Sequence, residues 1–144
     1  MLCFVFFYGA TITSFLCLAA ERLPHQLKWR EDADEKINIY LPSRCDSCNQ
    51  RISWLYLIPV VGYLLCGGKC KKCGSKVSIL YPLAEFFCGL ICVSIFYASE
   101  DFTKSVIISG VFLTLFFLSL IDIKETWLPA CVTIPLFWIG LLFS

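Results

Sequence analysis

The sequence predicts an α-helical polytopic membrane protein with about four apolar helices, the last one cut short, and one small cytoplasmic insert. Hydrophobic residues make up 58% of the 144 residues and charged residues 16%, whereas a soluble domain carries about 25% charged residues. The charges are also concentrated, because residues 21–76 hold 10 of the 12 Lys and Arg. These observations exclude both an ordinary soluble domain and a disordered chain.

The first predicted helix is Met1–Ala20, which contains no charged residue. It could be a cleaved signal peptide, but it lacks a basic start, and Glu21 and Arg22 follow it instead of small residues. We therefore expect a retained transmembrane anchor, with Pro24 ending the helix and starting the insert.

Three more apolar stretches follow the insert. Val77–Ser99 contains one charge, Glu85, and is long enough to cross a bilayer, which takes about 20 residues. Ser105–Ile121 reaches that length if it begins at Phe102. Ala130–Ser144 has no charge but only 15 residues, so we expect it to be cut short.

The domain boundaries predicted from this pattern are transmembrane helix 1 at 1–20, a cytoplasmic domain at 21–76 and a transmembrane region at 77–144. The ten basic residues of 21–76 place this segment in the cytoplasm, because short cytoplasmic loops are enriched in Lys and Arg. Its lysines would also attract anionic membrane lipid. Nucleic-acid binding is not expected, because no groove-reading helix or aromatic RNA platform is visible.

Four of the ten cysteines form a spaced pattern in the insert. Cys45 and Cys48 form one C-x-x-C pair, Cys70 and Cys73 form a second, and 21 residues separate the two pairs. This arrangement predicts a structural Zn²⁺ site with four thiolates and no open position for water. Bound metal would help to fold an insert that is too polar to build a large core alone.

Two alternatives to the metal site are a pair of disulfides and a set of redox-active thiols. A reducing cytoplasm disfavours the disulfides. Gly74 directly follows the second C-x-x-C pair, and Asn49 follows the first. Glycine and asparagine are the residues that most readily adopt the left-handed conformation, so both positions fit metal-binding turns.

Two carboxylates lie at the membrane edge in the predicted topology. Asp122 follows the third apolar stretch, and Glu85 lies inside the second. Intramembrane ionisable residues are often functional, but an interfacial charge that marks a helix end is the simpler interpretation of Asp122 alone. We expect the two residues to be offset in depth and do not predict that they form a catalytic pair.

Three blocks of residues point to a family. The first is Ser14-Phe15-Leu16 with Arg22-Leu23-Pro24. The second contains the four cysteines with Ser43-Arg44, Ile52-Ser53-Trp54, Ile58-Pro59-Val60, Gly68-Lys69, Ser78, Tyr81-Pro82 and Glu85. The third is Leu120-Ile121-Asp122-Ile123 with Leu128-Pro129. With these blocks the chain resembles the type IV prepilin peptidases, which are bifunctional leader peptidases and N-methyltransferases of the GxGD type.

The resemblance implies an aspartic endopeptidase in the bacterial inner membrane that serves type IV pilus biogenesis or type II secretion. Its substrates would be prepilins or pseudopilins with a short basic leader, cut after a glycine. The new N-terminus would then be methylated with S-adenosylmethionine as the cofactor. The resemblance makes Asp122 the first of two catalytic aspartates, and Cys45, Cys48, Cys70 and Cys73 the metal ligands.

The second aspartate of that family lies in a GxGD motif, which does not occur in these 144 residues. We therefore expect either the N-terminal part of a longer enzyme or a truncated form that is inactive alone. The main alternative is a catalytically inactive membrane zinc-module protein that binds pilin-like partners. A membrane thiol oxidoreductase that uses the C-x-x-C pairs is a third hypothesis.

Overall fold

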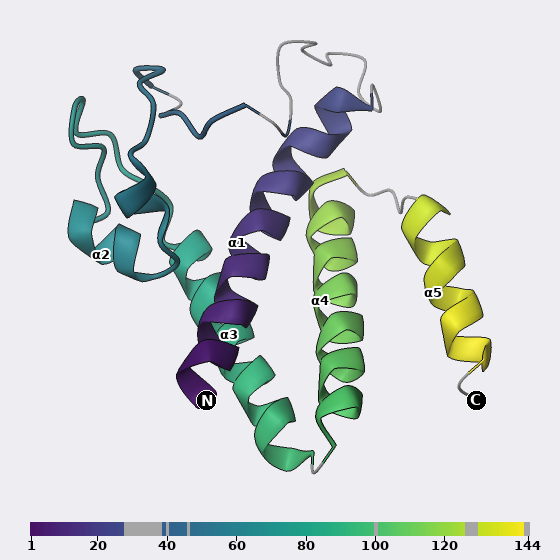
Figure 1. The fold of residues 1–144 in the computed structure, drawn as a ribbon. Helices are drawn as coiled ribbons and strands as arrows, with labels where there is room; N and C mark the ends of the chain where they lie inside the picture. Colours follow the sequence, from purple (N-terminus) through teal and green to yellow (C-terminus); the bar gives the residue numbers. More distant parts are fainter. Residues whose placement is uncertain (28–38, 40, 46, 100, 126–129, 143–144) are drawn as a thin grey trace.

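The computed structural model describes residues 1–27, 39, 41–45, 47–99, 101–125 and 130–142. Its elements are α1 (Leu2–Gln26), the short 3-10 helix η1 (Trp54–Leu57), α2 (Val61–Cys66), α3 (Leu80–Ala98), α4 (Phe102–Glu125) and α5 (Ala130–Leu142). Figure 1 shows α1, α3 and α4 as one bundle, with η1 and α2 in an insert beside the start of α3. Helix α5 lies on the side of α4 opposite α1.

The three bundle helices have the length and composition of membrane spans. Leu2–Gln26, Leu80–Ala98 and Phe102–Ile123 are each long and apolar enough to cross a bilayer. The end of α1, the start of α3 and the end of α4 lie at the same end of the bundle, together with the insert (Figure 1). The chain is therefore an integral membrane protein whose polar insert connects two antiparallel spans.

Small residues allow α1 and α3 to pack closely. A Cβ added at Gly9 would lie 2.8 Å from Cys92 Sγ and 3.2 Å from the backbone of Gly89. A Cβ added at Gly89 would similarly meet the ring and carbonyl of Phe6. Packing of this kind is typical of membrane helices, because burial away from lipid tails provides little hydrophobic driving force.

The ends of two helices can be compared with the sequence predictions. Helix α4 begins at Phe102, as its required length predicted. The prediction that Pro24 ends the first helix was wrong, since α1 continues to Gln26 with Pro24 buried inside it. The proline ring fixes φ at a value that a helix tolerates, and the Leu27 N–H still bonds to the Leu23 carbonyl at 2.9 Å.

The insert is held together mainly by turns and short helices. Helix α2 packs on η1 so closely that a Cβ at Gly62 would collide with the backbone of Tyr56. Gly67 ends α2 in the left-handed conformation, at φ 64°. In the sequence, one C-x-x-C turn precedes this η1–α2 unit and the other follows it.

Candidate metal centre and membrane-edge carboxylates

The two C-x-x-C pairs fold into turns with the same backbone hydrogen bonds. In the first turn, the Asn49 N–H donates to the Cys45 carbonyl at 2.8 Å; in the second, the Gly74 N–H donates to the Cys70 carbonyl at 2.9 Å. Asn49 has φ 54° and Gly74 has φ 72°, so the left-handed conformation predicted at both positions is confirmed. Each turn also closes with an isolated antiparallel bridge, Arg44 to Arg51 and Lys69 to Lys76.

These turns bring the four thiols together. The Sγ atoms of Cys45, Cys48, Cys70 and Cys73 all lie within 4.8 Å of one another. The Cys45–Cys73 and Cys48–Cys70 sulfur distances are 3.7 and 3.9 Å. A tetrahedron with Zn–S bonds of about 2.3 Å places its sulfurs about 3.8 Å apart, whereas a disulfide needs about 2.05 Å. The cluster therefore has the donor set and the spacing to hold a metal ion.

A serine that the sequence patterns did not single out supports two of the sulfurs. The Ser75 hydroxyl lies 3.3 Å from Cys45 Sγ and 3.1 Å from Cys73 Sγ. Its hydrogen bond is the main cause that lowers the pKa of Cys45 to about 6, and it also lowers the pKa of Cys73. The lowered pKa values favour the thiolate, which is the form that binds metal.

Cys48 behaves in the opposite way. A backbone hydrogen bond from Gln50 lowers its pKa, but desolvation and the neighbouring cysteine thiols outweigh that effect and raise the pKa to about 11. In the metal-free cluster a proton therefore remains on this sulfur. Because metal ligation requires a thiolate, binding must release that proton.

Asp122 lies one turn before the end of α4, with an exposed side chain. Two other carboxylates near this end of the bundle have partners elsewhere. Glu21 on α1 accepts a hydrogen bond from the Tyr81 hydroxyl, and Glu85 on α3 accepts one from the backbone of the insert. The donors to both carboxylates thus lie outside α4.

The contact of Glu85 was not visible in the sequence. The Glu85 side chain is 8% exposed, and its Oε2 accepts a hydrogen bond of 2.7 Å from the Val60 N–H. Val60 has φ 60° and ψ −53°, and the Val61 N–H reaches back to the Pro59 carbonyl at 2.6 Å. This is a classic γ-turn, which is rare and strained in proteins. The carboxylate thus holds a strained turn that starts α2.

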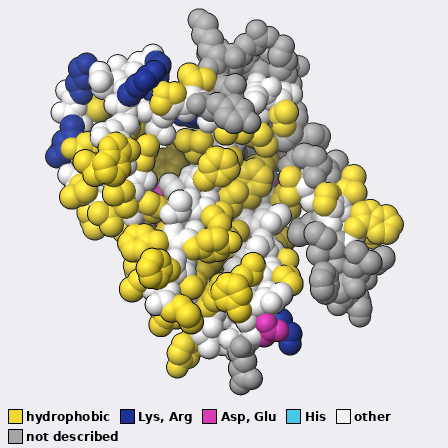
Figure 2. All heavy atoms as spheres, in the orientation of Figure 1, with side chains coloured by type: hydrophobic (Ala, Val, Ile, Leu, Met, Phe, Trp, Pro, Cys, Tyr) yellow, Lys and Arg dark blue, Asp and Glu magenta, His cyan; other side chains and the backbone are white. Residues whose placement is uncertain are grey.

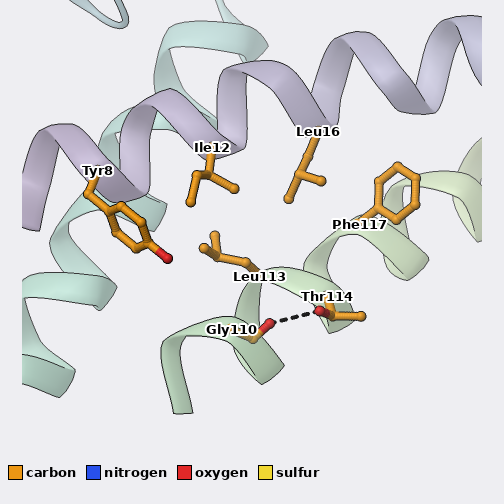
Figure 3. Close-up of a pocket in the computed structure, with 7 residues that line it drawn as sticks. All are labelled: Tyr8, Ile12, Leu16, Gly110, Leu113, Thr114 and Phe117. Atoms are coloured by element: carbon orange, nitrogen blue, oxygen red, sulfur yellow. Dashed lines mark hydrogen bonds between the residues drawn. The ribbon is translucent and has the colours of Figure 1, made fainter. Parts of the chain in front are cut away.

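An open groove with a volume of about 200 Å³ lies between α1 and α4. Figure 3 shows the side chains that line it. Within its lining, the Thr114 hydroxyl donates a hydrogen bond to the Gly110 carbonyl at 2.8 Å. The lining is mostly apolar and includes neither Asp122 nor a cysteine; it consists of Tyr8, Ile12, Leu16, Gly110, Leu113, Thr114 and Phe117. The groove is therefore a mostly apolar seam between two membrane helices.

Comparison with known proteins finds one matching family and several relatives that share one name. Residues 7–99 match the family described as Bacterial Peptidase A24 N-terminal domain. Relatives named "Prepilin leader peptidase/N-methyltransferase" include one from Neisseria gonorrhoeae, 33% identical over 94% of this chain and 53% of the relative. Another, from Klebsiella pneumoniae, is 33% identical over 98% of this chain and 60% of its own length.

A third relative with the same name, from Vibrio cholerae serotype O1, is 35% identical over 70% of this chain and 40% of its own length. The chain thus spans about half the length of the curated relatives it matches. No solved structure shows a significant match to it.

Proposed function

Because this chain belongs to the Bacterial Peptidase A24 N-terminal domain family, we propose that it acts in the cleavage of prepilin or pseudopilin leaders and in the N-methylation of the product. The observation that carries the proposal is the match over residues 7–99, together with relatives named for both activities. The system served would be type IV pilus biogenesis or type II secretion.

In this proposal Asp122 supplies one of two catalytic carboxylates. Peptide hydrolysis by an aspartic protease needs one ionised carboxylate to activate water and one protonated carboxylate to polarise the scissile carbonyl. Two carboxylates that lie close together acquire separated pKa values, so both forms coexist. The exposed position of Asp122 near the end of α4 is accessible to a substrate at the membrane edge, and the partner carboxylate would have to approach it there.

The tetracysteine cluster would bind a structural Zn²⁺ in the cytoplasmic domain. Four thiolates complete a tetrahedral site and leave no position for a catalytic water. The metal would join the two C-x-x-C turns, which the η1–α2 unit separates in the chain, and so would rigidify the insert. The methyl-transfer activity is supported only by the names of the relatives, and no residue in the described ranges is assigned to S-adenosylmethionine.

The proposed location is the bacterial inner membrane, with the insert in the cytoplasm. The support is the excess of Lys and Arg in residues 21–76 over the rest of the chain. The division into 1–20, 21–76 and 77–144 is retained as the domain proposal, although α1 continues as a helix to Gln26. Substrates with a short basic leader and anionic membrane lipid would meet the insert on this side.

The second candidate function is a membrane zinc module that binds pilin-like partners without cutting them. The observation that favours it is the preassembled cysteine cluster, whose four sulfurs all lie within 4.8 Å of one another. Cleavage in cells separates the two candidates.

The experiment expresses the protein from its complete gene, together with a prepilin, in a host that lacks its own prepilin peptidase. The peptidase proposal predicts a mature pilin with a methylated N-terminus, and loss of both changes with Asp122→Asn. Asp101→Asn is the matched control, because Asp101 is exposed at the opposite end of α4. Unprocessed prepilin with the unmodified protein would favour the non-catalytic candidate instead.

A further inference from the structure

Six large apolar side chains are exposed on the η1–α2 unit. We call these six residues the apolar foot. Trp54 is 72% exposed, Leu64 is 71% exposed and Leu65 is 54% exposed. The complete set is Trp54, Leu55, Leu57, Val61, Leu64 and Leu65. Contiguous exposed apolar surface of this kind marks a partner or a membrane.

The hydrogen bond from Val60 to Glu85 indicates the depth of the foot. Glu85 is the sixth residue of α3, and five residues of helix correspond to a rise of about 7.5 Å. The 19 residues of α3 span about 28 Å at 1.5 Å per residue, which is close to the hydrocarbon thickness of about 30 Å. Most of α3 is thus needed to cross the membrane, so the start of α2 lies at the membrane boundary rather than above it.

The apolar surface also continues from the foot onto the transmembrane bundle. Ile79 and Leu80, at the start of α3, are 56% and 71% exposed. Figure 2 shows hydrophobic side chains over the insert that run on to the bundle below, while the Lys and Arg side chains gather at the far end of the insert. The insert is thus amphipathic across its height, with the basic C-x-x-C turns on the side away from the bundle.

We propose that the apolar foot is an interfacial membrane anchor, inserted in the same bilayer that the three helices cross, and that Glu85 holds it at that depth. Continuity with the membrane-spanning surface identifies lipid as the occupant. Tryptophan favours the membrane–water boundary, and an interfacial helix buries its apolar face about 5–10 Å into the headgroup region. Glu85 is then a positioning residue, because its buried oxygen stabilises the strained turn from which α2 begins.

This arrangement fixes the cysteine cluster above the bilayer as well. The foot lies between the two C-x-x-C turns in the sequence, so anchoring it sets the height and tilt of the cluster. The inference concerns membrane contact alone and does not depend on the proposed peptidase activity.

The test measures the fluorescence of Trp54 in lipid vesicles. Trp29, Trp127 and Trp138 are replaced by phenylalanine, and the chain is reconstituted with phosphatidylcholine and phosphatidylglycerol. Brominated phosphatidylcholine should quench most of the Trp54 emission, while acrylamide in the water should quench it weakly. A matched chain with Trp54→Phe and Ser47→Trp should show the reverse, because Ser47 is exposed on the first C-x-x-C turn.

Strong quenching of Trp54 by acrylamide without quenching by brominated lipid would overturn the proposal in favour of a water-exposed surface. Weak quenching by both would also overturn it, since another part of the protein or a second copy would then cover the foot.

The role of Glu85 is tested in the same single-tryptophan chain. Glu85→Leu removes the acceptor of the Val60 N–H and should reduce lipid quenching of Trp54, whereas Glu85→Gln keeps an acceptor oxygen and should preserve it. Zinc content is measured alongside to confirm that the cysteine cluster still forms in both variants. Equal lipid quenching in the leucine and glutamine variants would refute the positioning role.

Discussion

Replacing Cys48 by serine tests the metal centre at the thiol whose pKa is raised to about 11. The observed sulfur distances of 3.7 and 3.9 Å differ by about 0.1 Å from those of a tetrahedral Zn–thiolate site. These two pairs of sulfurs therefore already have the spacing of zinc ligands. A serine oxygen is a poor substitute, because a neutral hydroxyl does not replace a thiolate ligand.

The size of the effect can be bounded. Loss of a residue that only supports a metal ligand lowers affinity by about 10–100-fold, so loss of a ligand should lower it by at least about a hundredfold. A hundredfold change corresponds to about 2.7 kcal/mol of stabilisation at fixed free zinc. Because zinc binds the folded insert, Cys48→Ser should destabilise the insert rather than the helix bundle.

The assay combines zinc content, measured by mass spectrometry after dialysis against a weak chelator, with limited proteolysis of the insert. We expect about one zinc per unmodified chain, and loss of zinc with faster cleavage of the insert for Cys48→Ser. Cys66→Ser is the matched control, because this thiol bonds to the Tyr63 carbonyl at 3.3 Å and lies outside the cluster. Retention of full zinc by Cys48→Ser, or equal loss by Cys66→Ser, would refute the assignment.

Two further predictions concern the thiol pKa values and the helix packing. Ser75→Ala should raise the pKa of Cys45 from about 6 towards its ordinary value. Alkylation of Cys45 in the metal-free protein should then need a higher pH. Ser47→Ala is the control and should have little effect, because Ser47 acts on Cys45 through its backbone. Gly9→Val should destabilise the bundle by about 1–3 kcal/mol in detergent unfolding. Gly110→Ala should be nearly neutral, since no atom beyond its chain neighbours and its own helix backbone lies within 4 Å of the added Cβ.

The membrane helices could be predicted because long apolar runs have few alternatives in a bilayer. The Val77–Ser99 stretch became α3 at Leu80–Ala98, and the start of α4 at Phe102 followed from the length a span requires. The error at Pro24 has a physical origin: proline removes one hydrogen bond, but the last turns of a helix can continue without it.

The cysteine cluster was also predictable, because spacing within a C-x-x-C turn is local and the left-handed residue after it is nearly obligatory. Asn49 and Gly74 showed this directly. The η1–α2 unit was not predicted, since four-residue and six-residue helices carry no measurable periodicity. The contact of Glu85 with Val60 joins residues 25 positions apart and depends on a strained turn. It could therefore be found only in the structure.

We propose above that Asp122 is a catalytic carboxylate of a prepilin peptidase. The most direct test of this claim is the initial rate at which the solubilised protein, expressed from its own gene, cleaves a purified prepilin. We predict that Asp122→Asn lowers this rate by at least about a thousandfold, as expected for loss of a catalytic carboxylate, while zinc content stays unchanged. Cleavage by Asp122→Asn at a rate within about tenfold of the unmodified protein, a difference of about 1.4 kcal/mol in the barrier, would contradict the claim.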